Sequence, residues 1–214
     1  MVKLSSSEEE NTEFLSSLWN RYKYLFIVGF TSLIVGIFGW ESWTESKDKN
    51  QQQASDSYEN FLEIISNTET DPTILAKEVI ENYPNSLYAD LVTLYLAKLQ
   101  VEKNNFSEAE KHLQWVLKKH SSFWKRDFDP IEVTTRQRLA RILVADNRPK
   151  EAFDLINDAK FLDNILYEIK GDAEYNLGLL TDARLSYLKA IESTQSPSVQ
   201  AILKMKLADL EAEN

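Results

Sequence analysis

An apolar run near the N-terminus constrains this chain more than any other feature of its sequence. It reads YLFIVGFTSLIVGIFGW from Tyr24 to Trp40, and its extension to Trp43 contains a single charge, at Glu41. A helix of this length spans a hydrocarbon core of roughly 30 Å. Every backbone amide must be paired inside lipid, so a lone span has to be helical. Residues 24–43 are therefore predicted to form a transmembrane helix.

Aromatic residues mark both ends of this run: Tyr22, Tyr24, Trp40 and Trp43. Amphipathic aromatic rings favour the headgroup level of a bilayer, so these four residues are predicted to anchor the helix at the two interfaces. A cleaved signal peptide would instead need small residues after the apolar run. The sequence GWESW at positions 39–43 is bulky there, which favours an uncleaved anchor.

The cations around the run predict its orientation. Arg21 and Lys23 adjoin its N-terminal side, whereas Lys47 and Lys49 lie farther from its other end. Cationic residues next to a span favour the cytoplasmic side. This pattern predicts a cytoplasmic tail over residues 1–23 and a large C-terminal part outside the cytoplasm.

Small residues recur along one side of the predicted membrane helix, at Gly29, Ser32, Gly36 and Gly39. Spacings of three and four place them on one helical face. Such a face allows a second membrane helix to approach closely, and self-association of the chain is one way to use it. The alternative is that these residues contact only lipid, because glycine is common in membrane helices.

Composition argues against several classes of function. The chain has 24 basic and 34 acidic residues, and this net charge of −10 disfavours a nucleic-acid partner. The sequence has no cysteine, and neither His112 nor His120 has a metal-binding partner four residues after it. It also lacks a phosphate-binding glycine loop and the common hydrolase motifs. We therefore expect no enzyme, no cofactor and no metal site.

The rest of the chain is predicted to be helical. Residues 44–57 are polar and form either a spacer or an extension of the membrane helix. From Tyr58 onward, apolar residues recur at spacings of three and four, as in amphipathic helices, and no alternating run argues for a sheet. Residues 58–214 are thus expected to be an all-α domain.

Proline and capping residues predict where several helices begin. Asp71 is the expected N-cap of one helix, with Pro72 at its first position, and Pro130 and Pro149 are each expected to open another helix. Ser107, with a glutamate three residues later, matches a capping box.

Three stretches share one pattern, with residues at intervals of seven, five, four and three. The first residue is small, where two antiparallel helices cross, and the second is a turn residue that tolerates a left-handed backbone. The third is small, and the last two bury the second helix. The three series are Ala97, Asn104, Ala109, Leu113 and Val116; Ala140, Asn147, Ala152, Ile156 and Ala159; and Gly171, Gly178, Ala183, Tyr187 and Ala190.

The pattern resembles the tetratricopeptide repeat, a helix–turn–helix of about 34 residues. The longer interval, between the first two series, contains FWKRDFDP at 123–130, an insertion or extended loop. Because one repeat cannot bury its apolar face alone, the hairpins are expected to stack into a solenoid. Residues 198–210 would form the cap, with five inward residues: Val199, Ile202, Leu203, Leu207 and Leu210. The expected fold is all-α, with one transmembrane helix followed by a tetratricopeptide-like (TPR) helical-hairpin solenoid.

In such a solenoid the first helix of each hairpin lines a concave groove. This groove is the predicted partner-binding surface. Its expected lining is Leu94, Lys98 and Val101, then Gln137, Arg141 and Val144, then Glu168, Asp172 and Tyr175.

The whole layout resembles the YfgM family, bacterial inner-membrane proteins that are ancillary subunits of the SecYEG translocon. The residues that carry the resemblance are GWESW at 39–43, LAR at 139–141, GDAE at 171–174 and AR at 183–184. The resemblance implies a single-pass inner-membrane protein with a cytoplasmic N-terminus and a periplasmic repeat domain. It also implies two partners, a SecYEG-type translocon and a PpiD-type periplasmic chaperone.

The expected function is therefore that of a membrane-anchored protein-binding adaptor or chaperone-like subunit, which assists the handover of secreted proteins in the periplasm. The alternative is a homo-oligomeric tether or scaffold of a cell-envelope complex. Such a tether would associate through the small face of the membrane helix.

Overall fold

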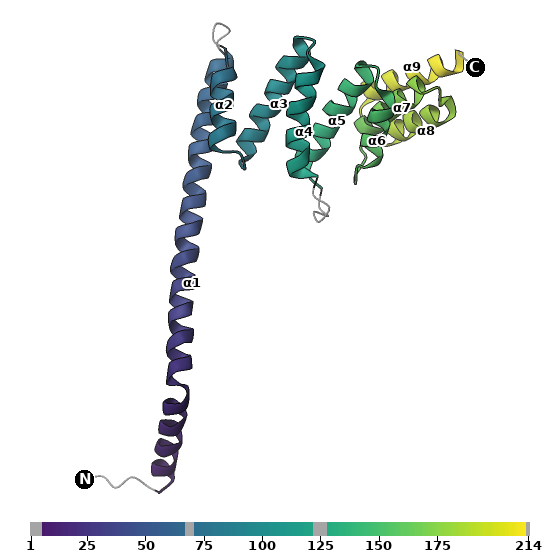
Figure 1. The fold of residues 1–214 in the computed structure, drawn as a ribbon. Coiled ribbons are helices and arrows are strands. Elements are labelled where there is room, and N and C mark those ends of the chain that lie inside the picture. The colour runs from purple at the N-terminus through teal and green to yellow at the C-terminus, as the bar shows by residue number, and fades with distance from the viewer. Residues whose placement is uncertain (1–5, 67–70, 122–127, 213–214) are drawn as a thin grey trace. The chain divides into compact units, whose positions relative to one another are not determined.

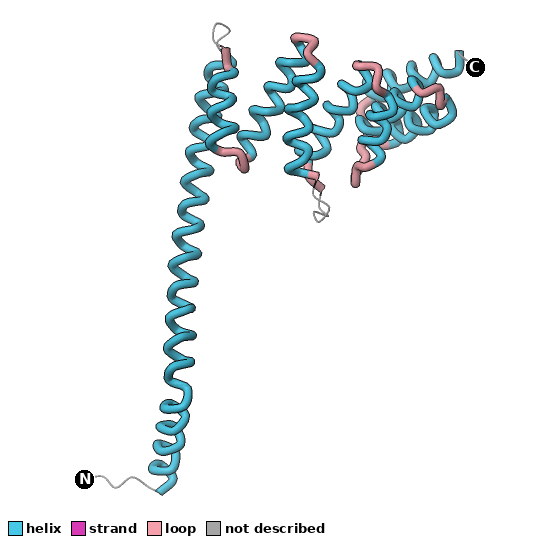
Figure 2. The backbone as a smooth tube through the Cα atoms, in the orientation of Figure 1, coloured by secondary structure: helices cyan, strands magenta, loops and turns pink. Residues whose placement is uncertain are grey.

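The computed structural model describes residues 6–66, 71–121 and 128–212, and in these ranges it contains nine helices and no strand (Figures 1 and 2). This confirms the predicted all-α class. The chain divides into two compact units, residues 1–53 and 54–214. The inserted aromatic cluster at 123–126 lies outside the described residues.

The first unit is helical from residue 6 onward and belongs to α1 (Ser6–Ser66). Within the described residues, Arg21–Phe38 is the stretch that is long and apolar enough to cross a membrane, and none of its described side chains is buried. Exposed apolar side chains over such a length favour lipid as their surroundings. Residues 44–57 are helical as well.

The predicted membrane-facing residues are partly described. Tyr22, Tyr24 and Trp40 are exposed, with 39%, 71% and 68% of their surface accessible. A Cβ atom added at Gly29 or Gly36 would meet no atom within 4 Å. The neighbouring Ser32 is exposed too, whereas the surroundings of Gly39 and of the Trp43 side chain lie outside what the structure describes. Self-association through this small face stays a prediction.

The second unit begins with the last turns of α1, which pack against α2 (Thr73–Asn82) and α3 (Leu87–Glu102). Phe61 is 1% exposed and meets the ring of Tyr95 edge-on, with 5.3 Å between the ring centroids. Burial of this aromatic ring fixes the end of α1 to the helices that follow.

Three helical hairpins follow one another along the second unit (Figure 1). They are α3 with α4 (Phe106–His120), α5 (Pro130–Ala145) with α6 (Pro149–Asn157), and α7 (Asn164–Asn176) with α8 (Leu180–Glu192). The last helix, α9 (Pro197–Ala212), packs against α8.

The three hairpin turns have the same backbone conformation. Asn104, Asn147 and Gly178 have φ values of 57°, 59° and 75°, and they are the residues with positive φ in the described chain. In each turn this residue donates its amide three residues back, and the next residue donates five residues back, as in a Schellman motif. The predicted left-handed turn positions are confirmed.

Small residues lie at the predicted helix crossings. Ala97, Ala140 and Gly171 are buried, and Ala109, Ala152 and Ala183 are fully buried on the second helices. Large residues cannot occupy these points, because the helix backbones approach closely there. The structure therefore confirms the small positions of the pattern. The residues expected to bury the second helix are buried as well, except Ala159, which is half-buried and lies beyond the end of α6.

Three local predictions are wrong. Pro72, not Asp71, is the N-cap residue of α2, because the helix begins at Thr73, whose amide donates to the Asp71 carboxylate at 2.9 Å. Asn105, not Ser107, is the N-cap of α4, and its side chain accepts the Glu108 amide at 3.4 Å. Helix α4 begins at Phe106, directly after the left-handed turn at Asn104 and earlier than a cap at Ser107 would allow. Ile202 is 52% exposed, since Val199, Leu203, Leu207 and Leu210 already form the buried face of α9.

A carboxyl group is buried between α7 and α8. Glu174 is 3% exposed and accepts a hydrogen bond from the Ser186 hydroxyl at 2.6 Å, with Lys170 at 3.8 Å. Burial raises the pKa of Glu174, and Ser186 and Lys170 offset only part of that effect. The folded state therefore holds this proton to higher pH than the unfolded chain, and stability falls as the pH rises through that window.

Glu174→Gln is expected to raise the free energy of unfolding at pH 7 by roughly 1 kcal/mol, because a neutral amide avoids the buried charge. Near pH 4 the variant and the parent should be equally stable. Urea unfolding of the full chain in mild detergent, followed by circular dichroism across this pH range, measures both. Glu192→Gln, an exposed change on α8, is the control, and a Glu174→Gln curve parallel to the parent curve would contradict the argument.

Candidate protein-binding groove

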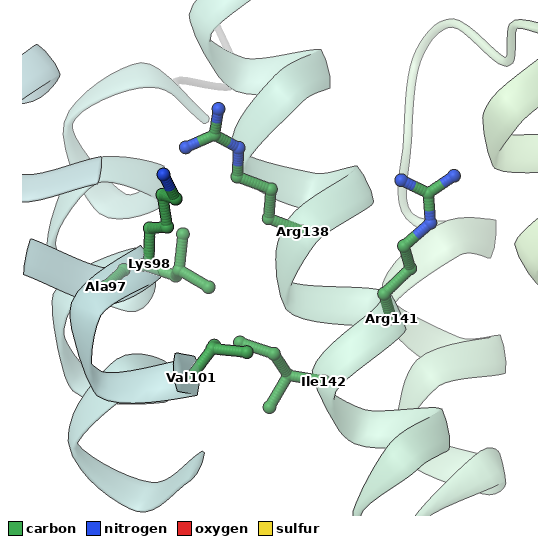
Figure 3. A pocket seen from close by; sticks show the side chains of 7 residues that line it. Ala97, Lys98, Val101, Arg138, Arg141 and Ile142 are labelled. Carbon is green, nitrogen blue, oxygen red and sulfur yellow. The ribbon is translucent and has the colours of Figure 1, made fainter. Parts of the chain in front are cut away.

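An open groove of about 340 Å³ lies between the first helices of two successive hairpins, α3 and α5. Helix α4 contributes Leu113 to its floor. Figure 3 shows its lining residues: Ala97, Lys98, Val101, Leu113, Arg138, Arg141 and Ile142.

The floor of the groove is apolar. Ala97, Leu113 and Ile142 are buried and Val101 is half-buried. Val101 of α3 and Ile142 of α5 point toward one another (Figure 3). An apolar side chain placed between them would leave water, which favours binding in proportion to the area buried.

Three cationic side chains surround this floor. Lys98 lies 3.5 Å from Glu102, and Arg141 lies 3.9 Å from Glu168, and more than half of each cationic side chain is exposed. At these separations, with the cation largely in water, each pair contributes little, so it competes weakly with a partner. Arg138 donates to the Leu94 carbonyl at 3.4 Å. Among the described residues that line the groove, none is acidic.

Lys98, Val101 and Arg141 are the predicted partner-binding residues that line this groove. The other three residues predicted on α3 and α5 lie elsewhere. Leu94 is 5% exposed, Val144 packs against the core, and Gln137 donates to Asp163 at 2.7 Å. Asp163 caps α7, so Gln137 joins two helices rather than facing a partner.

The predicted residues of α7 contact α9. Lys206 of α9 donates to Glu168 at 2.9 Å and to Asp172 at 2.7 Å. Burial opposes the charged form of Lys206, yet these two carboxylates raise its pKa overall. Tyr187 also donates to Asp172, at 2.8 Å, and Tyr175 packs in the cluster that α8 and α9 share. This part of the predicted surface is therefore occupied by the chain itself.

Arg138 and Ile142 are lining residues that the sequence pattern missed. The predicted face of α5 ran through Gln137, Arg141 and Val144, whereas the observed face runs through Arg138, Arg141 and Ile142. The signal was present, because 138, 141 and 142 also follow helical spacing. The register of the repeat pattern alone does not distinguish between these two faces of α5.

Comparison with known proteins agrees with this architecture. The profile of a family described as "Tetratricopeptide repeat-like domain" matches residues 16–212. A protein of Escherichia coli (strain K12) is 22% identical over 98% of this chain and 99% of its own length. Relatives in Aggregatibacter actinomycetemcomitans and Neisseria gonorrhoeae are each 26% identical, over 95% and 85% of this chain and 97% and 88% of their own lengths.

All three relatives are named "Ancillary SecYEG translocon subunit", and the resemblance drawn from the sequence to the YfgM family is thereby confirmed. The repeat signature, the stacked hairpins and the profile match over nearly the whole chain agree with one another. The chain belongs to the tetratricopeptide repeat-like domain family.

Proposed function

We propose that this protein is a membrane-anchored adaptor of a Sec-type translocon, which binds a protein partner in the groove between α3 and α5. The observation that carries the proposal is the open apolar floor with its cationic rim. Buried apolar cores with polar surroundings are typical of protein-binding surfaces. The names of the full-length relatives support a translocon as the associated complex.

The proposed topology follows from the cations beside α1. Arg21 and Lys23 would keep the N-terminus in the cytoplasm, and residues 54–214 would lie in the periplasm of a bacterial cell. There the adaptor would assist the handover of secreted proteins, together with a PpiD-type chaperone. Protease access to the C-terminal domain in spheroplasts tests this orientation, and a domain protected until the inner membrane is lysed would contradict it.

A photo-crosslinking residue in place of Val101 is expected to capture a translocon subunit or a periplasmic chaperone in intact cells. The half-buried position lies inside the groove, so a bound segment would come within reach of the probe. The control carries the probe at Lys150, an exposed position on α6 away from the groove lining. Mass spectrometry identifies the adducts. Equal adducts from both positions, or none from Val101, would contradict groove binding.

A further inference from the structure

We propose that the groove between α3 and α5 selects an acidic protein segment, in which one apolar side chain is flanked by carboxylates. This inference rests on the proposed function, and it adds the chemistry of the partner. Its basis is a group of three weakly paired cations beside an apolar floor, in a chain that is acidic as a whole.

Two arginines outside the groove, Arg136 and Arg148, bind the chain's own acceptors at short distances. Arg148 pairs with Glu110 at 2.6 Å and with Glu151 at 2.7 Å. Arg136 donates to Glu132 at 2.8 Å and to the Leu155 carbonyl at 2.6 Å. In a chain with ten more acidic than basic residues, such pairing is the expected state of an arginine.

The cations of the groove depart from this state. Among the described residues, no carboxylate forms an ion pair with Arg138, which donates to the Leu94 carbonyl at 3.4 Å. The partners of Arg141 and Lys98 lie at 3.9 Å and 3.5 Å, beyond the length of a strong charged hydrogen bond. The groove therefore has unused capacity for carboxylates, and a guanidinium group can bind one with two parallel hydrogen bonds.

The floor defines the second element of the partner. Val101 and Ile142 point toward one another and line the same groove as Leu113 and the three cations, so an apolar side chain of a partner would contact them there. A segment with carboxylates alone would leave the apolar floor in contact with water. An uncharged apolar segment would bring no carboxylate to the three cations. An amphipathic acidic segment satisfies both features at once.

The test uses the full chain in mild detergent and a fluorescent 12-residue peptide with one phenylalanine flanked by four glutamates. Anisotropy is expected to show binding at least about tenfold tighter than for the same peptide with glutamines, and binding should weaken as salt rises. Arg138→Glu with Arg141→Glu should lower the affinity at least about tenfold. Arg138→Gln with Arg141→Gln should give an intermediate loss.

The matched control is Arg184→Glu with Lys204→Glu, which changes the net charge equally at exposed positions of α8 and α9 and should leave binding unchanged. Circular dichroism establishes that each variant is folded. Equal binding of the two peptides, or acidic-peptide binding that survives the groove reversal, would overturn the inference. Competition by phosphatidylglycerol vesicles that depends on Arg138 and Arg141 would overturn it in favour of lipid. The Val101 crosslinks could still succeed in any of these cases, so failure here is distinct from failure of the adaptor function.

Discussion

His120→Ala is expected to lower the free energy of unfolding by about 3 kcal/mol. The imidazole lies between two carboxylates: its Nδ1 is 2.7 Å from Asp129 Oδ2, and its Nε2 is 3.0 Å from Asp90 Oδ2. The Asp90 side chain is 4% exposed and also binds Lys119. Removal of the ring leaves two largely buried carboxylates with fewer hydrogen bonds, and this accounts for the expected size of the loss.

The position of His120 makes this loss relevant to the groove. Asp90 belongs to α3, and Asp129 is the N-cap of α5, where it accepts the Ile131 amide at 3.0 Å. The ring at the end of α4 therefore joins the two helices that line the groove. We expect His120→Ala to weaken partner capture at Val101 as well as stability.

The same substitution should alter the acid sensitivity of the fold. Burial alone would raise the pKa of Asp129, but hydrogen bonds from His120 and from the Glu132 and Ile131 amides hold it below its usual value. A lowered folded-state pKa contributes stability that is complete above the unfolded value and is lost as the pH falls through the folded one. His120→Ala should therefore reduce the dependence of the free energy of unfolding on pH below about pH 4.

Urea unfolding of the full chain in detergent at pH 7 and at lower pH measures both effects. The control is His112→Ala. His112 is half-buried on α4, and burial lowers its pKa, but it makes no hydrogen bond to the described residues. We expect its replacement to cost about 1 kcal/mol or less. Equal losses for the two histidines would show that the carboxylate bridge does not stabilise the protein.

The hairpin turns could be predicted from the sequence because few residue types tolerate their backbone. A left-handed φ at Asn104, Asn147 and Gly178 favours asparagine and glycine, so the turn positions can be recognised in the sequence. The helix crossings can be recognised in the same way, since only small residues fit there. Because such local constraints restrict the residue types, the fold class and the repeat register can be predicted from one sequence.

The candidate site was only partly predictable, because its remaining features are contacts between distant residues. Lys206 lies 34 residues from Asp172 and 38 from Glu168, and a surface charge carries no periodic signal that identifies its partner. The face of α5 was misplaced by one residue, Gln137 for Arg138. A helix turns about 100° per residue, so that small error moved a lining position out of the groove.

Gly171→Ala is the second large effect that we expect, a loss of about 2 kcal/mol or more in the free energy of unfolding. A Cβ atom at this position would lie 2.4 Å from Cε1 and 2.6 Å from Cδ1 of Tyr187. The ring is 3% exposed, and its hydroxyl donates to Asp172 at 2.8 Å, so it cannot move aside without losing that bond. Burial and the neighbouring Asp172 raise the pKa of Tyr187, which keeps the donor proton in place.

The sequence of the three repeats shows why this clash is specific to the third hairpin. In the first two repeats, the small residue on the first helix is alanine, and the fourth residue of the series, on the second helix, is leucine or isoleucine. In the third repeat the small residue is glycine, and the fourth residue of the series is Tyr187. A larger ring on the second helix is thus matched by a smaller residue on the first. Helix propensity alone predicts the opposite outcome, since alanine is favoured over glycine by about 1 kcal/mol in a helix interior.

Double-mutant analysis by urea unfolding distinguishes the two effects. If packing against Tyr187 sets the cost, Gly171→Ala combined with Tyr187→Leu should lose less stability than the sum of the single changes, because the shorter side chain makes room for the methyl group. Ala140→Gly, the reverse change at the equivalent crossing of α5 and α6, should also destabilise, by about 1 kcal/mol. A Gly171→Ala variant at least as stable as the parent would mean that α7 and α8 do not approach each other this closely, and the match between small and large positions would then have no physical basis.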